Sequence, residues 1–336
     1  MYFDITMPIT LFAAVLVAVF LNDKVEQKLK GVFEGKEFRN RDALLLVASI
    51  GVTVSIVIFI PQLAIMALFL FSYSMVLFIF GYLFSNMRSE RATVSLAAFI
   101  VVGLILSAAE LFVFRNSGYS VYGFVVFMGF SGLVLAALLY DRLRTDAGER
   151  WYLAALPPAL FISLYFFFSE TPIWFPYLLN SYALVFAVLI ILYLSSMFKW
   201  NTMLLFVTAL TVVDIILVLF TGTMVSAART VSALKLPILV SLPTVPTIQF
   251  RGYELYMSLG LGDFFFAGLL AIQTIKRYGR KTAVIALIAM AISFFIYETY
   301  LLNFEVQAFP GTLMIICGWL PVVAIAELAK KRSHPS

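Results

Sequence analysis

Long apolar stretches, each bounded by polar or charged residues, follow one another along nearly the whole chain. A helix needs about 20 predominantly apolar residues to cross the hydrocarbon core of a bilayer, and most of these stretches have that length. The pattern therefore predicts an all-α, polytopic bundle of transmembrane helices. We place eleven spans, at 5–21, 43–60, 63–84, 92–113, 120–140, 151–168, 174–197, 202–221, 255–275, 282–301 and 309–328.

The first span is short, and we interpret it as an uncleaved anchor. A cleaved signal peptide is less consistent with the sequence, because no basic region precedes the apolar run.

Lys and Arg residues alternate between the two sides that these spans define. Of the 23 basic residues, 19 fall in one set of loops together with the C-terminal tail, and four fall in the other set. Because basic residues mark cytoplasmic loops, we predict that the N-terminus lies outside and the C-terminus lies inside. The net charge of +5 then reflects orientation in the membrane, and we expect no nucleic-acid partner.

Composition excludes several kinds of site. Hydrophobic residues make up 63% of the chain and charged residues 12%, against about 45–50% and 25% in soluble domains. The single histidine, His334, lies in the C-terminal tail, which excludes chemistry based on a membrane-embedded histidine. The single cysteine, Cys317, excludes disulfides within the chain and cysteine-rich metal sites. No lysine falls inside a predicted span, so we expect no retinal-type Schiff base.

Four acidic residues fall inside the predicted spans, apart from Glu327 at the very end of the last one. Glu110 and Glu298 lie near the outer ends of their spans, where we expect interfacial solvation or a hydrogen bond to a neighbouring helix. Asp214 and Asp263 lie well inside apolar runs, where a carboxylate is costly unless it is paired or solvated. The spans offer no basic partner, so we predict that Asp214 and Asp263 face each other across a water-filled cavity.

The two aspartates are predicted to lie at similar depths. Asp214 is twelve residues into its span from the cytoplasmic side, or roughly 18 Å at 1.5 Å per residue. Asp263 is eight residues into its span from the outer side, or roughly 12 Å. In a hydrocarbon core about 30 Å thick, these two levels nearly coincide.

A G-x-G-D sequence, formed by Gly260, Leu261, Gly262 and Asp263, contains the second aspartate. Glycines beside a buried acid allow another backbone to approach closely and leave room for water. Packing between helices through small residues is the alternative explanation.

These motifs resemble a family of membrane proteases. The segment R-G-Y-E-L-Y-M-S-L-G-L-G-D-F-F-F at 251–266 is similar to the second catalytic helix of presenilin and signal peptide peptidase, and 198–218 is similar to the preceding catalytic helix. Where the family usually has Tyr-Asp, this chain has Val213-Asp214. The family's Pro-Ala-Leu sequence corresponds to Pro310, Gly311, Thr312 and Leu313, which keep the proline and change the next two positions.

The resemblance implies a presenilin-like core of nine spans with about two extra N-terminal spans. Residues 1–62 would hold the extra spans and a charged cytoplasmic loop, 63–197 the first part of the core, and 198–336 the catalytic region. The short loops are typical of a prokaryotic, archaeal homologue in the cytoplasmic membrane.

The activity that the resemblance implies is that of an intramembrane aspartyl protease, without a metal or an organic cofactor. Asp214 and Asp263 would be catalytic, and Gly260, Leu261 and Gly262 would support them. The residues Pro310, Gly311, Thr312 and Leu313 would bind substrate. Two neighbouring carboxylates share a proton, so one can take a proton from water while the other donates a hydrogen bond to the scissile carbonyl.

The implied substrates are transmembrane peptides or signal-peptide remnants within the lipid bilayer. With the C-terminus inside, the catalytic helices would run as in signal peptide peptidase, which favours type II substrates, whose N-terminus is cytoplasmic. The outer connection at 222–254 is rich in β-branched residues and broken by prolines. We expect it either to offer a strand edge to an extended substrate or to act as a flexible tether.

Two other functions are compatible with the sequence. A type IV prepilin peptidase also uses two aspartates and a G-x-G-D sequence, although it usually has fewer spans. An ion- or proton-coupled transporter or channel would use Asp214 and Asp263 as ligands for cations or protons. Peptide cleavage by the purified protein would indicate a protease, whereas ion-coupled uptake into vesicles would indicate a transporter.

Overall fold

The computed structural model describes residues 2–33, 38–59, 89–109, 120–143, 151–223, 225–226, 237–250, 252–304 and 308–333. The predicted span at 63–84 and Glu110 lie outside these residues. The chain forms two compact units, one of Met1–Ala67 with Ala183–Ser336 and the other of Leu68–Tyr182. The larger unit holds both aspartates that the sequence singles out.

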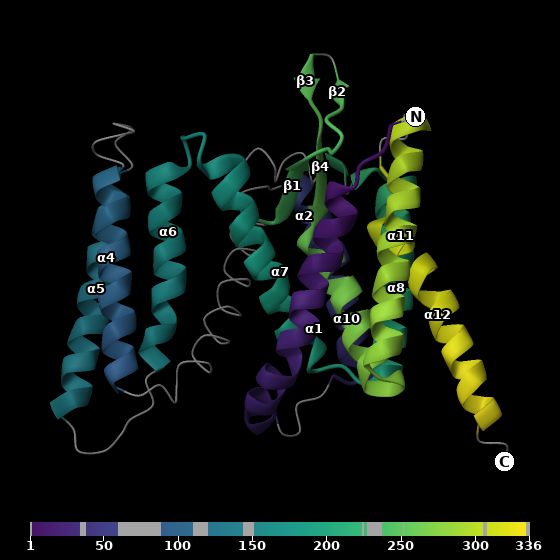
Figure 1. Ribbon diagram of the computed structural model, residues 1–336, viewed down its shortest axis with the longest axis horizontal. Coiled ribbons are helices and arrows are strands. Elements are labelled where there is room, and N and C mark those ends of the chain that lie inside the picture. Colours follow the sequence, from purple (N-terminus) through teal and green to yellow (C-terminus); the bar gives the residue numbers. More distant parts are fainter. Residues whose placement is uncertain are drawn as a thin grey trace. The chain divides into compact units, whose positions relative to one another are not determined.

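Helices make up most of the described chain, as the apolar pattern predicts (Figure 1). Among the described residues, seven helices are long and apolar enough to cross a membrane: Thr6–Asp23, Glu90–Ala109, Val121–Tyr140, Trp174–Ser195, Trp200–Phe220, Arg280–Phe304 and Gly311–Arg332. This finding confirms a polytopic, all-α helical bundle, while the count of eleven spans stays a prediction. The predicted spans at 43–60 and 151–168 also form helices, α2 (Asn40–Phe59) and the shorter α6 (Leu156–Phe168).

The smaller unit consists of α4 (Ser89–Ala109), α5 (Ser120–Leu143), a 3-10 turn (Trp151–Ala155), α6 and a π-helical turn (Trp174–Leu178). Its helices pack through aromatic and small residues. The rings of Phe99 and Phe127 stack with their centroids 5.0 Å apart, and Phe127 also fills the space beside Gly103, where a Cβ would come within 1.9 Å of the ring.

The larger unit is built around a buried helix, α10 (Leu261–Tyr278). All of its residues from Phe264 to Thr274 are buried, which is typical of a helix enclosed by neighbours on every side. Those neighbours include α1, α8, α11 and α12. The helices of this unit are α1 (Thr6–Phe33), α2, most of α7 (Leu179–Ser195), α8 (Trp200–Ile215), α10, α11 (Arg280–Phe304) and α12 (Gly311–Ser333).

Polar groups on α10 are satisfied within the bundle. The side-chain amide of Gln273 donates to the backbone carbonyl oxygens of Ser195 and Phe198, at 3.2 and 2.7 Å. The indole N–H of Trp319 on α12 donates to the hydroxyl oxygen of Thr274 at 2.9 Å. Such bonds fix neighbouring helices because the interior of a membrane offers no water as an alternative partner.

The predicted span at 255–275 is wrong at its beginning. Residues Tyr256–Gly260 form strand β4, and the helix begins only at Leu261. Hydropathy alone does not separate a short apolar strand from a helix, and glycine disfavours the helix interior. Asp263 therefore lies in the first turn of α10, and the depth derived from eight preceding helical residues does not apply.

β4 belongs to a β-hairpin that leads into α10. It pairs antiparallel with β1 (Leu239–Pro243), and beyond this pair β2 (Gln249–Phe250) pairs with β3 (Tyr253–Glu254). Figure 1 shows the hairpin at one end of the larger unit. The outer connection at 222–254 is thus not a simple tether, since part of it forms β1, β2 and β3.

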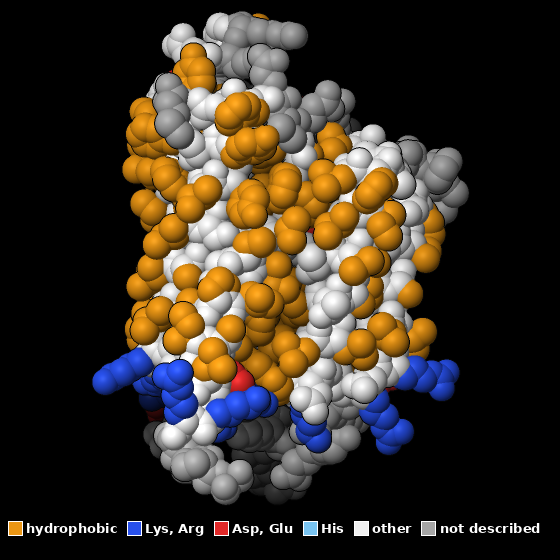
Figure 2. All heavy atoms as spheres, turned by 90° about the vertical axis from the view of Figure 1, so that its right-hand side faces the viewer, with side chains coloured by type: hydrophobic (Ala, Val, Ile, Leu, Met, Phe, Trp, Pro, Cys, Tyr) orange, Lys and Arg blue, Asp and Glu red, His pale blue; other side chains and the backbone are white. Residues whose placement is uncertain are grey.

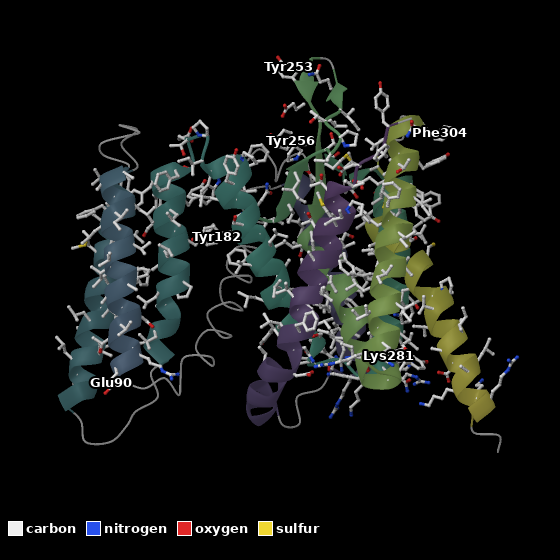
Figure 3. The ribbon with its side chains drawn as sticks, in the orientation of Figure 1. Glu90, Tyr182, Tyr253, Tyr256, Lys281 and Phe304 are labelled. Carbon is white, nitrogen blue, oxygen red and sulfur yellow. The ribbon has the colours of Figure 1, made fainter. Side chains whose placement is uncertain are left out.

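The outer surface of the larger unit has the character of a membrane protein. Exposed isoleucines at 285, 288, 292 and 296 form a stripe along α11, as expected of a helix face in contact with lipid. Figure 2 shows hydrophobic side chains over this side of the unit and Lys and Arg side chains gathered at one end. Lys281 lies at this basic end, whereas Phe304 and Tyr253 lie at the opposite end (Figure 3).

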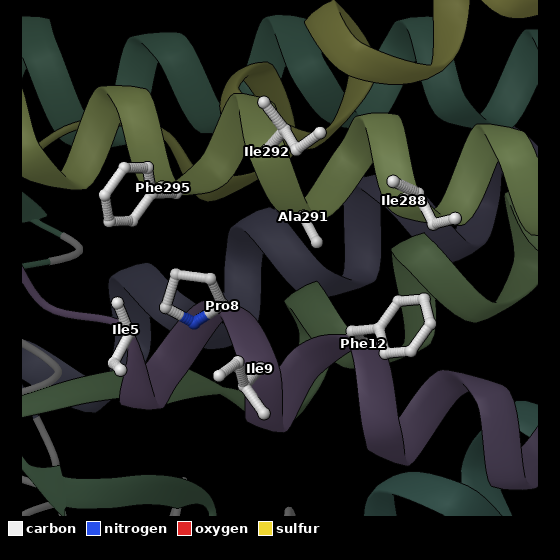
Figure 4. A pocket seen from close by; sticks show the side chains of 8 residues that line it. All are labelled: Ile5, Pro8, Ile9, Phe12, Ile288, Ala291, Ile292 and Phe295. Carbon is white, nitrogen blue, oxygen red and sulfur yellow. The ribbon is translucent and has the colours of Figure 1, made fainter.

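A groove of about 360 Å³ runs between α1 and α11 (Figure 4). Its lining is entirely apolar and consists of Ile5, Pro8, Ile9, Phe12, Ile288, Ala291, Ile292 and Phe295. Beyond the groove, the backbone N–H of Tyr2 donates to the side-chain oxygen of Asn303 at 2.9 Å, and the Asn303 amide donates to the Tyr2 carbonyl at 2.6 Å. These bonds hold the N-terminal segment against α11.

Candidate functional site

Three helix ends lie together in the larger unit and carry the two aspartates. Asp214 is the last residue but one of α8, which continues as a π-helical turn over Ile216–Phe220. Asp263 lies in the first turn of α10. The beginning of α12, at Gly311 and Thr312, contacts both acids.

Asp263 is placed by the junction of β4 and α10. Gly260 is at once the last residue of β4 and the N-cap of α10, with an extended backbone at φ −71° and ψ 147°. The Asp263 carboxylate, three residues further on, lies beside the Gly260 backbone, with Oδ2 3.3 Å from the position that a Cβ on this glycine would take. The strand that precedes the helix therefore helps to fix the orientation of this acid.

Asp214 is held by α12. The hydroxyl of Thr312 donates to Oδ2 of Asp214 at 2.6 Å, and the backbone N–H of Thr312 donates to the same oxygen at 3.3 Å. Because the first N–H groups of a helix have no partner within the helix, an acid on α8 satisfies a donor on α12. Val213, which precedes Asp214, lies against Gly51 on α2, with Cγ1 3.5 Å from the position of a Cβ on that glycine.

Gly311 makes room for Asp263. A Cβ at Gly311 would lie 2.4 Å from Oδ1 of Asp263, so the carboxylate is in contact with the α12 backbone. Gly311 and Thr312 are neighbours, with Cα atoms about 3.8 Å apart, and each contacts one of the two acids. The two carboxylates are close enough to interact electrostatically. Within the described part of the chain, neither forms a salt bridge.

The other residues predicted for the site lie around this junction. Leu261 is buried and Gly262 is exposed, with open space where a side chain would begin. The carbonyl oxygen of Pro310 accepts hydrogen bonds from the N–H groups of Leu313 and Met314, both at 3.2 Å, which starts the first turn of α12.

The hairpin brings a strand edge to the same junction. β1 and β4 form a two-stranded sheet in which Ser241 pairs with Ser258, and their hydroxyl oxygens lie 2.7 Å apart. The Leu261 N–H, at the start of α10, donates to the carbonyl of Ile238 at 3.1 Å. Since no third strand joins this sheet within the described residues, one edge of each strand is left without a partner strand.

The prediction for Glu298 is wrong. Its side chain is 1% exposed, so it is not solvated at an interface, and neither carboxylate oxygen has a hydrogen-bond partner. It interacts electrostatically with Asp4, which is equally buried at the beginning of α1. The analysis of apolar spans missed Asp4 because it precedes the first run, although an acid just before a helix is a common N-terminal signal.

The arrangement of Asp214 and Asp263 suits acid–base chemistry on a water molecule. Two carboxyl groups that interact at the junction of three helix ends can share a proton and divide the roles of acid and base. The described residues contain no group of three His, Cys, Asp or Glu side chains that could hold a metal ion. No protein-family model and no curated protein matches this chain.

Proposed function

We propose that this chain is an intramembrane aspartyl protease, which hydrolyses peptide bonds within transmembrane helices or signal-peptide remnants. The observation that carries the proposal is the meeting of Asp214 and Asp263 at the start of α12, where Thr312 holds one carboxylate and Gly311 leaves space for the other. The resemblance of the G-x-G-D segment to presenilin and signal peptide peptidase supports the same function.

The mechanism follows from the unequal roles of two neighbouring acids. The ionised carboxylate takes a proton from water, and the protonated carboxyl group donates a hydrogen bond to the scissile carbonyl oxygen. Attack by the water oxygen on the carbonyl carbon, with transfer of the second carboxyl proton to the carbonyl oxygen, gives a tetrahedral diol. The carboxyl group that took the water proton then protonates the amide nitrogen, the C–N bond breaks, and a diol hydroxyl returns its proton to the pair, which again holds one shared proton. Because the two acids titrate as a unit, neither role belongs permanently to one residue.

The substrate must be extended at the scissile bond, since a helix buries its peptide groups in internal hydrogen bonds. The β1–β4 hairpin is suited to hold the substrate in this extended form, because β4 runs directly into the turn that carries Asp263. An extended substrate segment that adds to the free edge of this sheet would satisfy its backbone groups outside water. Its scissile bond would then lie beside the first turn of α10.

The proposed orientation places the basic end of the larger unit in the cytoplasm. The positively charged residues of the α10–α11 connection and of the end of α12 favour that side. The catalytic helices would then run as in signal peptide peptidase, and type II transmembrane peptides would be the preferred substrates.

The purified chain in detergent or proteoliposomes provides the test, with a type II transmembrane peptide as substrate. Asp214→Asn and Asp263→Asn are each expected to abolish cleavage, because an amide cannot act as a base or share the proton. Loss of either half-buried carboxylate is expected to leave the thermal midpoint unchanged or raised. Asp23→Asn is the matched control, since this aspartate lies on α1 and pairs with Arg280 at the basic end.

Two results would overturn the proposal. One is full cleavage by either Asn variant. The other is the absence of cleavage by the wild type together with ion-coupled uptake into vesicles that depends on Asp214 and Asp263, which would assign the same residues to a transporter.

A further inference from the structure

A second pair of buried acids lies away from Asp214 and Asp263, between the start of α1 and the outer part of α11. Asp4 and Glu298 are each 1% exposed and interact electrostatically. The proposed proteolysis uses neither of them. Two neighbouring carboxylates in an apolar interior need a partner, so their surroundings decide what that partner is.

Asp4 is already well supplied with hydrogen-bond donors. Its Oδ1 accepts from the backbone N–H of Thr6 at 3.0 Å and of Val245 at 2.8 Å, and its Oδ2 accepts from the N–H of Met7 at 3.2 Å. A carboxylate offers about four lone-pair positions, so three are occupied and one on Oδ2 is free. The three N–H donors and the beginning of α1 therefore compensate negative charge at Asp4.

Glu298 has the opposite environment. Both of its carboxylate oxygens are buried and lack a hydrogen-bond partner. The hydroxyls of Thr299, beside it on α11, and of Thr6, at the start of α1, are also buried without a partner. Buried polar groups without a partner are rare in folded proteins and call for a specific explanation, such as an ion. Here every such atom is an oxygen.

The apolar groove in Figure 4 lies next to the residues that carry the two acids. Ile5 and Phe295 lie together at one end of the groove, Ile5 just before α1 and Phe295 on α11. Asp4 precedes Ile5 directly, and Glu298 follows Phe295 by three residues, so it lies on the same side of α11 one turn further on. The acids thus lie just beyond the end of the groove that Ile5 and Phe295 line.

We propose that the pocket formed by Asp4, Glu298, Thr6 and Thr299 binds a sodium ion. Backbone donors already balance the charge of Asp4, so one negative charge, that of Glu298, is left uncompensated. A monovalent cation matches this charge. Hard cations prefer oxygen ligands, which are the only free ligands here. Calcium needs six to eight oxygen ligands and magnesium usually keeps several waters, so neither fits a small pocket with apolar walls.

The ion would strengthen a contact between the N-terminal helix and the hairpin. Asp4 binds the N–H of Val245, and the Ile5 N–H donates to the carbonyl of Val245 at 3.1 Å. Val245 is the second residue after the end of β1, and β1 pairs with the strand that leads into α10. Sodium binding would therefore stabilise the N-terminal segment, the hairpin and α11 as one assembly.

Thermal unfolding of the purified full chain tests this inference without reference to proteolysis. At pH 8 and constant ionic strength, replacing choline chloride by NaCl is expected to raise the unfolding midpoint saturably, by at least about 2 °C. KCl and CaCl2 at the same ionic strength are expected to give smaller rises. Glu298→Gln should remove the response to sodium, and Glu254→Gln, which changes an exposed acid on β3, should keep it.

Direct binding of radioactive sodium to the wild type gives a second measurement that does not depend on how well the variants fold. Saturable binding with one site per chain supports the inference. Absence of such binding, a sodium response that survives Glu298→Gln, or a midpoint that follows pH alone in every salt would overturn it. The last result would mean that Glu298 takes up a proton instead of an ion.

Discussion

Thr312 binds Asp214 through two donors, its hydroxyl group at 2.6 Å and its backbone N–H at 3.3 Å, both directed at the same carboxylate oxygen. A side chain at the start of α12 thereby fixes an acid at the end of α8. The neighbouring Gly311 meets the other acid, Asp263. The start of α12, which we compare with the family's Pro-Ala-Leu sequence, therefore contacts both carboxylates.

Thr312→Val is expected to lower the rate of peptide cleavage about tenfold or more. Valine keeps the shape of threonine and the backbone donor but removes the hydroxyl bond to a charged group, which is worth about 1.5–3 kcal/mol. Thr312→Ser should restore most of the activity. Thr208→Val on α8, whose hydroxyl bonds only the carbonyl of Leu204, serves as the control. Equal rates for the two valine variants would contradict the positioning role.

Gly311→Ala is expected to reduce cleavage strongly while the protein stays folded. A methyl group there would lie 2.4 Å from Oδ1 of Asp263, and the end of that side chain can move away. The acid would then be displaced from the position that this geometry gives it. Gly132→Ala on α5, away from the proposed catalytic motif, is the control, because no atom lies within 4 Å of the Cβ it would add. Similar losses in both variants would show that contact with Asp263 is not the cause.

The sequence could predict the helical bundle, because long apolar runs have few other solutions in a membrane. It also singled out Asp214 and Asp263, since acids deep in such runs need an explanation. It could not predict that Asp263 begins a helix, because the alternation of exposed Ser258 and buried Leu259 lasts too few residues to distinguish β4 from an apolar helix. That distinction depends on the pairing of β4 with β1, a strand 17 residues away at Ser241 and Ser258.

The burial of Glu298 could not be predicted from the sequence, for a related reason. Position along a span gives an approximate depth but not the direction in which a side chain points or what covers it. The burial of Glu298 comes from the packing of α1 onto α11 and from Asp4, which is nearly 300 residues away in sequence. The contact between Gly311 and Asp263 is likewise a property of the assembled bundle.

Gly318→Leu is expected to destabilise the larger unit. Even a Cβ at this position on α12 would lie 2.3 Å from the carbonyl oxygen of Ala289 on α11, and a backbone atom cannot move aside as a side chain can. Overpacking of this kind typically costs about 1–3 kcal/mol, which corresponds to a fall of several degrees in the thermal midpoint. Gly129→Ala on α5, which would meet no atom within 4 Å, should change the midpoint little.

The C-terminal tail is expected to lie in the cytoplasm. Four basic residues, Lys276, Arg277, Arg280 and Lys281, surround the connection between α10 and α11, and three more end the described part of α12. Arg277 pairs with Glu327 near the end of α12, so the two groups lie at one end of the larger unit, and Figure 2 shows Lys and Arg side chains gathered at one end. Since basic residues remain on the cytoplasmic side during insertion, we expect the end that carries the hairpin to face the outside.

Reporter fusions after Ser336 measure this orientation. A green fluorescent protein fusion is expected to fluoresce and an alkaline phosphatase fusion to be inactive, because the first folds in the cytoplasm and the second needs the oxidising side of the membrane. Snorkelling of the terminal basic residues alone would predict no preferred side. The control is a phosphatase fusion at Tyr253 in the hairpin, which should be active. The reverse pattern at both positions would place the catalytic helices in the presenilin orientation and remove the preference for type II substrates.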